Sequence, residues 1–206
     1  MIRSLNRIPW LVIALIGYYL PWLYHNAAGL TFNAYDLAEW ISIHPAVRDG
    51  NPPLLAPFLL RAVLGALALL AALRAARSFG WERWLYTVFA LALAITLMPP
   101  LEFFRDAADD PNYRQQFILA VVVLVLFLGI AAASYRPWLK WVEVTVPTLT
   151  AVATIWGVVL ALNVAQSLHL EHTLGGGVIV LLVCLAMMVM SRLTGQPEQV
   201  VGEQMK

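Results

Sequence analysis

The chain has 206 residues, of which 61% are hydrophobic and only 12% are charged, and its mean hydropathy is +0.76. Because globular proteins carry about 25% charged residues, this composition excludes an ordinary water-soluble fold and predicts an integral membrane protein whose first partner is the lipid bilayer. The formal net charge of +1 provides no strongly basic surface. We therefore expect no nucleic-acid partner.

Six apolar segments are candidates to cross the bilayer. A hydrocarbon core of about 30 Å needs roughly 20 mostly apolar residues in a helix. The candidate segments, separated by prolines, glycines and charged residues, are approximately 8–24, 54–73, 84–101, 117–135, 144–168 and 174–190. The sequence therefore predicts an all-α fold, with a single transmembrane domain over residues 1–206 that forms a bundle of six membrane-spanning helices.

The basic residues predict the orientation of this bundle. If the N-terminus is inside, the inner side carries nine Lys and Arg residues against four carboxylates, and the outer side carries four against eight. Cytoplasmic loops are the ones that are enriched in Lys and Arg. We therefore predict a multi-pass protein of the cell membrane (plasma or inner membrane), with both termini cytoplasmic and a short cytoplasmic tail over 192–206.

The first outer connection contains a predicted amphipathic helix at about 34–44. Asn33 is a favourable N-cap residue, Leu37 and Ile41 recur at helical spacing, and Pro45 follows. Such a helix could lie flat in the outer leaflet as an interfacial helix, or fold over the mouth of the bundle as a lid. The sequence leaves both arrangements open.

Arg61 is the only charged residue inside the predicted spans. Residues 62–73 provide only 12 apolar residues, about 18 Å of helix, so the second span has to include Arg61. A guanidinium at the bilayer centre costs about 3 kcal/mol on insertion scales, and less near an interface. We therefore expect either that Arg61 snorkels to the outer surface or that a carboxylate partner forms a charge lock with it, and the candidate partners are Glu102, Asp36 and Glu39.

Two further polar residues, Asn163 and Gln166, lie toward the outer end of the fifth predicted span. Together with Arg61 and Glu102 they predict a ligand-binding site or charge lock in the outer half of the bundle, although a hydrogen bond from Asn163 to a neighbouring helix explains its position equally simply. The same span also has a face of small residues, where another helix can pack closely. These residues are Thr150, Thr154, Gly157 and Ala161.

All four histidines fall on the predicted outer side. They are His25, His44, His169 and His172. Imidazoles near carboxylates bind zinc or copper or titrate near neutral pH, so these residues are the candidate metal ligands. However, His-x-x-His in a short turn is not the His-Glu-x-x-His signature of a metalloprotease helix. We therefore prefer an ordinary interfacial role for the histidines and expect no cofactor.

Three functions are compatible with the sequence. The favoured one is a non-catalytic accessory or scaffold subunit of a membrane assembly, which would have other membrane subunits as partners. The second is a small-solute binding or transport component with a site in the outer half of the bundle, and the third is a membrane enzyme or metal site on the outer face. The sequence contains no nucleotide-binding loop, nucleophile elbow or metal signature that would favour an enzyme.

Overall fold

The computed structural model describes residues 8–25, 29–132 and 139–194. Its α-helices are α1 (Ile8–Tyr19), α2 (Ala34–Ser42), α3 (Pro45–Arg48), α4 (Leu55–Arg77), α5 (Gly80–Thr96), α6 (Pro111–Ala132), α7 (Leu139–Ser167) and α8 (Gly176–Leu193). A 3-10 helix, η1 (Leu101–Phe104), follows α5, and the short strands are β1 (Leu23–His25), β2 (Leu30–Phe32) and β3 (His172–Leu174). The predicted helical fold is confirmed, with a small sheet that the sequence analysis did not predict.

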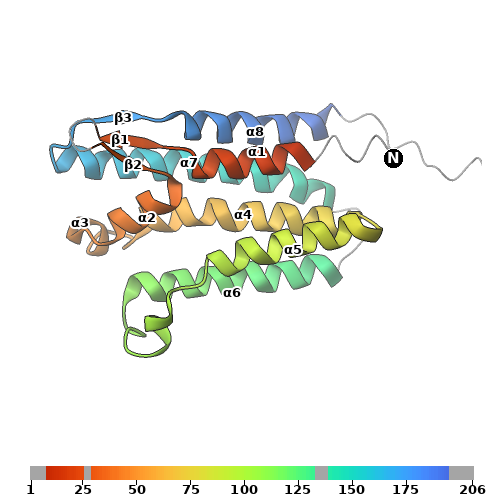
Figure 1. Ribbon diagram of the computed structural model, residues 1–206, viewed down its shortest axis with the longest axis horizontal. Coiled ribbons are helices and arrows are strands. Elements are labelled where there is room, and N and C mark those ends of the chain that lie inside the picture. Colours follow the sequence, from red (N-terminus) through yellow and green to blue (C-terminus); the bar gives the residue numbers. More distant parts are fainter. Residues whose placement is uncertain (1–7, 26–28, 133–138, 195–206) are drawn as a thin grey trace, which may run out of the picture.

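The bundle has two distinct ends (Figure 1). Helices α1, α4, α5, α6, α7 and α8 run along the long axis, and the connections between them alternate from one end to the other. One end, called the sheet end below, carries the three strands together with α2, α3 and η1. The opposite end, where α1 begins and α8 finishes, is called the terminal end.

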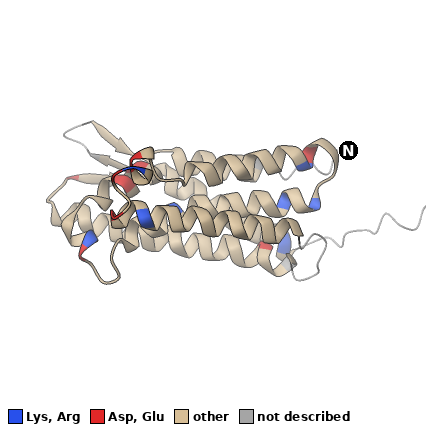
Figure 2. Cartoon of the chain, turned by 90° about the horizontal axis from the view of Figure 1, so that it is seen from below, with Lys and Arg blue, Asp and Glu red and all other residues tan. Residues whose placement is uncertain are grey.

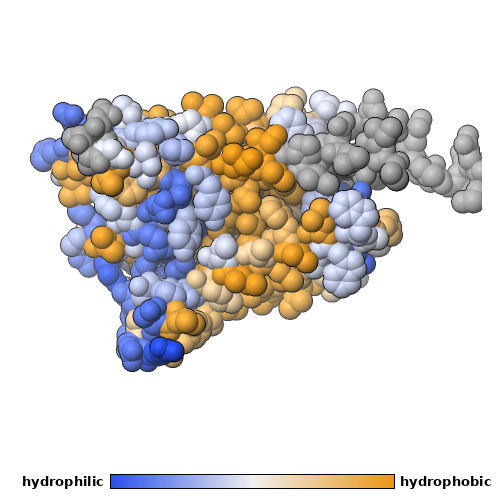
Figure 3. All heavy atoms as spheres, viewed as in Figure 1, coloured by the Kyte–Doolittle hydropathy of each residue, from blue (hydrophilic) through white to orange (hydrophobic). Residues whose placement is uncertain are grey.

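Four helices are long and apolar enough to cross a membrane. They are α4, α6, α8 and the part of α7 over Trp141–Ser167. The helices α1 and α5 have 12 and 17 residues and are shorter. Figure 3 shows apolar side chains over the middle of the bundle and hydrophilic ones at the sheet end, so the chain has the surface of a helical membrane protein.

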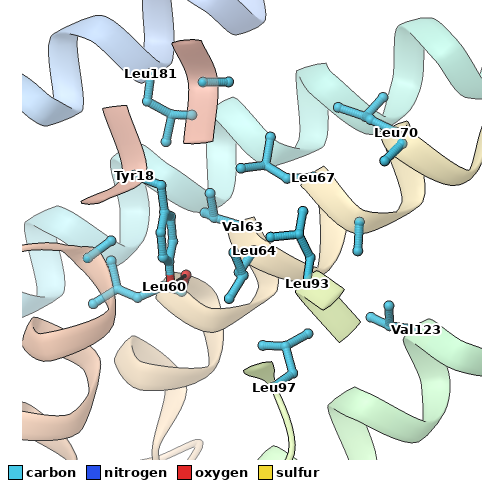
Figure 4. Packing of buried hydrophobic residues seen from close by; sticks show 14 of the residues in the cluster. Tyr18, Leu60, Val63, Leu64, Leu67, Leu70, Leu93, Leu97, Val123 and Leu181 are labelled. Carbon is cyan, nitrogen blue, oxygen red and sulfur yellow. Dashed lines mark hydrogen bonds between the residues drawn. The ribbon is translucent and has the colours of Figure 1, made fainter. Parts of the chain in front are cut away.

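Helix α4 is the centre of the bundle. It packs against α5, α6, α7 and α2, and its residues Val63, Leu64 and Leu67 are fully buried among side chains of the surrounding helices (Figure 4). A helix that is apolar on all sides is expected in such a position. Gly65 brings α6 close, because a Cβ added there would lie 2.8 Å from the side chain of Val123.

Small residues also fix the two other main helix contacts. The predicted small-residue face of α7 packs against α4, where a Cβ added at Gly157 would lie 3.1 Å from the side chain of Leu60. Helix α1 packs mainly against α8, and a Cβ added at Gly177 would lie 2.8 Å from the backbone oxygen of Gly17. Close backbone approach of this kind is typical of helix association in membranes.

The sheet changes two of the predicted span boundaries. Helix α1 ends at Tyr19 instead of continuing to residue 24, because Pro21 lacks the N–H that a helix requires and the chain then enters β1. The last predicted span begins at Leu174, which instead ends β3. In the sheet the order is β2-β1-β3, and both neighbours of β1 are antiparallel to it.

Charged residues lie toward the two ends of the bundle (Figure 2). Two groups of them are buried and tie helices together. One lies beneath α2 near the sheet end, around Arg61, and the other lies at the terminal end, around Glu143.

Candidate functional site

The predicted helix after Asn33 forms as α2 and ends at Ser42. The side-chain oxygen of Asn33 accepts hydrogen bonds from the backbone N–H groups of Tyr35 and Asp36, at 2.9 and 3.0 Å. Asn33 therefore satisfies two of the donors that a helix N-terminus leaves free. Only the last two residues of the predicted range differ, because the chain turns at Ile43 and starts the short helix α3 at Pro45.

Helix α2 packs onto the bundle through its apolar face. Leu37, Ala38 and Ile41 are buried, and α4 is the main neighbour of α2. These contacts place the apolar face of α2 against α4, as expected for a helix folded over the bundle.

Arg61 lies on the second turn of α4, directly beneath α2. Its side chain has no exposed surface, and its Nη2 donates to Glu39 Oε1 at 2.7 Å. Its Nη1 donates to Asn112 Oδ1, at the start of α6, at 2.8 Å. The third nitrogen, Nε, has no hydrogen-bond partner among the described residues. The guanidinium thus joins α2, α4 and α6 through Nη1 and Nη2.

Glu39 is the carboxylate that contacts Arg61, out of the three considered from the sequence. Its side chain is 38% exposed, so the ion pair reaches the surface on the Glu39 side only. The carboxylate of Asp36 instead accepts a hydrogen bond from Asn33 at 2.7 Å. Glu102 is exposed on η1.

A second polar contact lies one helical turn away on both helices. Gln116 Nε2 donates to the hydroxyl of Tyr35 at 3.3 Å. Gln116 follows Asn112 by four residues and Tyr35 precedes Glu39 by four, which places each pair on one face of its helix. Gln116 is buried and its Oε1 has no hydrogen-bond partner in the described ranges. Burial, and then the charge of Glu39, raise the pKa of Tyr35, so its hydroxyl stays protonated. Arg61, Glu39, Asn112, Tyr35 and Gln116 are called the Arg61 cluster below.

A third tie joins α3 to the start of α6. Arg48 Nη2 and Asp110 Oδ2 are 2.6 Å apart, and the other oxygen of Asp110 accepts hydrogen bonds from the backbone N–H groups of Asn112 and Tyr113. Burial acts to raise the pKa of Asp110, but these hydrogen bonds and the charge of Arg48 outweigh it, so the pKa is lowered. Polar contacts to α6 therefore hold both the start of α2, through Tyr35, and the segment after its end, through Arg48.

The other predicted site residues lie elsewhere. Asn163 and Gln166 are exposed on α7, and Asn163 lines a groove of about 350 Å³ between the α3–α4 connection and α7. Within the described chain, no hydrogen bond or ion pair joins any two of Arg61, Glu102, Asn163 and Gln166. The four residues therefore do not form one directly connected cluster.

The histidines are brought together only in part. His25 and His172 are partners in the register of β1 and β3, and the His172 ring lies 2.8 Å from the carbonyl of Leu170. His44 is the N-cap of α3, where its Nδ1 accepts a backbone N–H, and His169 adopts a left-handed backbone conformation with φ of 54°. The described ranges contain no group of three or more His, Cys, Asp or Glu residues that could hold a metal ion.

Comparisons with known proteins provide no relative from which residue roles can be transferred. No protein-family model, curated protein or solved structure matches this chain. The function therefore has to be argued from the chemistry of its own side chains.

The second buried charge group was missed by the sequence analysis, which used the charged residues of the inner side only to predict the orientation of the bundle. Glu143, on the first turn of α7, has a side chain that is 3% exposed, and it pairs with Arg77 at 2.6 Å, Arg192 at 2.7 Å and Arg74 at 3.9 Å. These four residues, called the Glu143 cluster, join α4, α7 and α8 at the terminal end. The sequence did contain a signal for this cluster. Glu143 directly precedes the fifth predicted span, and arginines follow the second and the sixth.

The two clusters differ in what they can do. In the Glu143 cluster three cations share a carboxylate that is almost completely buried, which suits it to holding helices together. In the Arg61 cluster a fixed, buried cation meets a carboxylate that has access to water. This access makes the Arg61 cluster the better candidate for a binding site.

Proposed function

We propose that this chain is a non-catalytic membrane protein that binds a small solute at its sheet end, beneath α2, with Arg61 as the principal binding group. The observation that carries this proposal is the position of Arg61. It is fully buried in the bundle, it contacts the covering helix α2, and its Nε has no partner among the residues that the structure describes. An arginine that served only to snorkel would extend toward the surface. Arg61 instead points into the contact between α2, α4 and α6.

We further infer a six-span topology in the cell membrane with both termini cytoplasmic. The six long-axis helices, which alternate in direction (Figure 1), support this count, and the shorter α1 and α5 lie alongside the four longer ones. The arginines of the Glu143 cluster lie at the terminal end, and a basic end is expected to face the cytoplasm. The Arg61 cluster and α2 then lie at the outer surface.

The accessory-subunit hypothesis loses one of its supports. It relied on small-residue faces that a partner helix could use, and the face on α7 packs against α4 of the same chain. The hypothesis still makes a distinct prediction, which is that another protein stays bound when the chain is extracted from its membrane.

Native mass spectrometry of the full chain, extracted in mild detergent from its own membrane, tests the proposal. We expect a small molecule to be retained by the wild type and lost in Arg61→Met, which removes the charge but keeps an apolar side chain. Arg105→Met is the matched control, because Arg105 is exposed on the loop after η1, and this variant should retain the molecule. A spectrum with no small molecule and a stoichiometric partner protein would overturn the proposal and favour an accessory subunit.

A further inference from the structure

We propose that the solute is a short carboxylate that replaces the Glu39 carboxylate on Arg61, so that Glu39 occupies the binding site when the solute is absent. This inference rests on the proposed function, because it names the chemical class of the solute for the same site. Three observations support it: the single hydrogen bond between Glu39 and Arg61, the exposure of the Glu39 side chain, and the Oε1 of Gln116, which has no partner among the described residues.

Glu39 uses only part of the hydrogen-bonding edge that Arg61 offers. A guanidinium presents its N–H groups as a rigid fork that matches the two oxygens of a carboxylate. Here Nη1 is bonded to Asn112 and Nη2 to a single oxygen of Glu39, while Nε, on the same edge as Nη2, has no partner in the part of the chain that is described. A carboxylate placed on Nε and Nη2 together would use both donors.

The position of α2 explains why Glu39 makes only one of these two bonds. Leu37 and Ile41 are buried against the bundle, so the backbone of Glu39 is fixed and its short side chain approaches Arg61 from one direction. A free carboxylate has no such tether, and it can align both oxygens with the guanidinium.

Glu39 is also the member of the pair that can leave. Arg61 has no exposed side-chain surface, whereas the side chain of Glu39 is 38% exposed. If Glu39 turns toward water, its charge is solvated and no buried carboxylate is left unpaired. Exchange of an external carboxylate for Glu39 therefore leaves Arg61 neutralised both before and after binding, which a buried cation requires.

The acceptor on Gln116 suggests a second feature of the solute. Its Oε1 is buried and has no partner among the described residues, while its Nε2 is bonded to Tyr35. Gln116 lies one helical turn along α6 from Asn112, a rise of about 6 Å. A hydroxyl or ammonium group at a comparable distance from the carboxylate can donate to this oxygen. We therefore expect short hydroxy- or amino-carboxylates to bind better than simple ones.

Binding of three probes to the purified full chain tests this inference, with affinity measured by isothermal titration. The probes are 4-hydroxybutyrate, butyrate and the neutral 1,4-butanediol. We expect 4-hydroxybutyrate to bind most tightly, butyrate more weakly, and butanediol not at all. Glu39→Gln should raise the affinity for both carboxylates at least tenfold, because the internal competitor loses its charge, and Arg61→Met should abolish binding.

Two further variants test whether Glu39 competes directly with the solute for Arg61. One controls for the loss of a negative charge at this end of the bundle, and the other for a failure of Glu39→Gln to fold. Glu102→Gln removes an acidic charge from an exposed residue at the same end, and it should leave both affinities unchanged. Glu39→Asp keeps the charge but shortens the side chain by one methylene, which weakens its contact with Arg61. It should raise the carboxylate affinity even if Glu39→Gln does not fold.

The outcomes distinguish this inference from the proposed function. If both Glu39 variants leave carboxylate binding unchanged, the inference that the solute replaces Glu39 on Arg61 is wrong. If the protein binds no carboxylate but retains a neutral or cationic solute that is lost in Arg61→Met, the solute is not a carboxylate. The proposed function then still holds. Absence of any retained or bound small molecule in the wild type and in both Glu39 variants would overturn the proposed function itself.

Discussion

Replacing Glu143 by Gln removes the charge at the centre of the Glu143 cluster while keeping the shape of the side chain. In the native protein one carboxylate faces the guanidinium groups of Arg77, Arg192 and Arg74. The variant leaves these three cations close together on α4 and α8 without that carboxylate between them. We expect the free energy of unfolding to fall, because each arginine loses the same counter-charge at once.

The magnitude follows from the burial of the pair. Removal of one partner from a fully buried ion pair costs about 3–5 kcal/mol. The carboxylate of Glu143 is 3% exposed, but the arginine side chains are 17–25% exposed, so water screens part of the loss and we expect about 2–4 kcal/mol. Arg77→Gln should cost only about 1 kcal/mol, because Arg192 and Arg74 still pair with Glu143. The shared carboxylate should therefore matter at least twice as much as any single arginine.

Thermal unfolding in detergent, followed by tryptophan fluorescence, measures this difference. At about 2–4 °C per kcal/mol for a chain of this size, Glu143→Gln should lower Tm by roughly 4–16 °C and Arg77→Gln by a few degrees. The control is Glu82→Gln, at the same end of the bundle on α5, because Glu82 makes no ion pair with another described residue. Equal losses for Glu143→Gln and Arg77→Gln, or a neutral Glu143→Gln, would refute the idea that the carboxylate is the shared centre of the cluster.

Three further predictions concern other parts of the fold. Glu39→Ala should cost about 1–3 kcal/mol, because it leaves a buried cation unpaired while water screens part of the loss at the 38% exposed carboxylate. Arg61→Met should cost less, and the double variant should resemble Arg61→Met in a double-mutant cycle of unfolding free energies. Gly177→Ala should destabilise the protein by about 1–3 kcal/mol, because its Cβ would lie 2.7 and 2.8 Å from backbone oxygens of the chain near the end of α1, whereas Gly176→Ala, whose Cβ meets nothing within 4 Å, should leave Tm unchanged. The pKa of Asp110 is lowered in the folded state, so its contribution is present above its ordinary pKa of about 3.9 and is lost as the pH falls through the lower, folded-state value; Asp110→Asn should therefore lower Tm at neutral pH, and the difference from wild type should shrink on acidification.

The features that could be predicted from the sequence are those set by local physical chemistry. The long apolar helices follow from runs of apolar residues whose backbone groups bond within the helix, which is the arrangement that lipid requires. The start of α2 follows from Asn33, whose side chain acts on the next three residues only. A carboxylate partner for Arg61 was one of the two arrangements expected, because the length of the apolar segment after it places Arg61 inside the span.

The choice of partner for Arg61 depends on three-dimensional packing and could not be read from the sequence. Asp36, Glu39 and Glu102 are equivalent in charge, and only the seating of α2 on α4 places Glu39 within reach. Asn112, which binds another edge of the same guanidinium, sits at the start of a different helix with no sequence feature that links it to Arg61. The Glu143 cluster depends in the same way on the relative positions of three helix ends.

The sheet was missed for a different reason. Each strand has three residues, which is too short for an alternating apolar pattern to be recognised. The pairing of Leu23 with Leu174 also joins segments about 150 residues apart, and nothing in either segment alone indicates that contact. Pro21 was the available signal, because it predicts that a helix stops before it.

The same pairing has a consequence for the order in which the protein assembles. Helix α1 and strand β1 are synthesised long before α8 and β3, yet these late elements are their main partners. During translation α1 therefore enters the membrane with the small-residue surface around Gly17 uncovered, and it reaches its final position only when the last hairpin emerges from the ribosome. Insertion of the C-terminal helix is then the step that closes the bundle, and a chain interrupted before α8 leaves its earliest helix without its main neighbour.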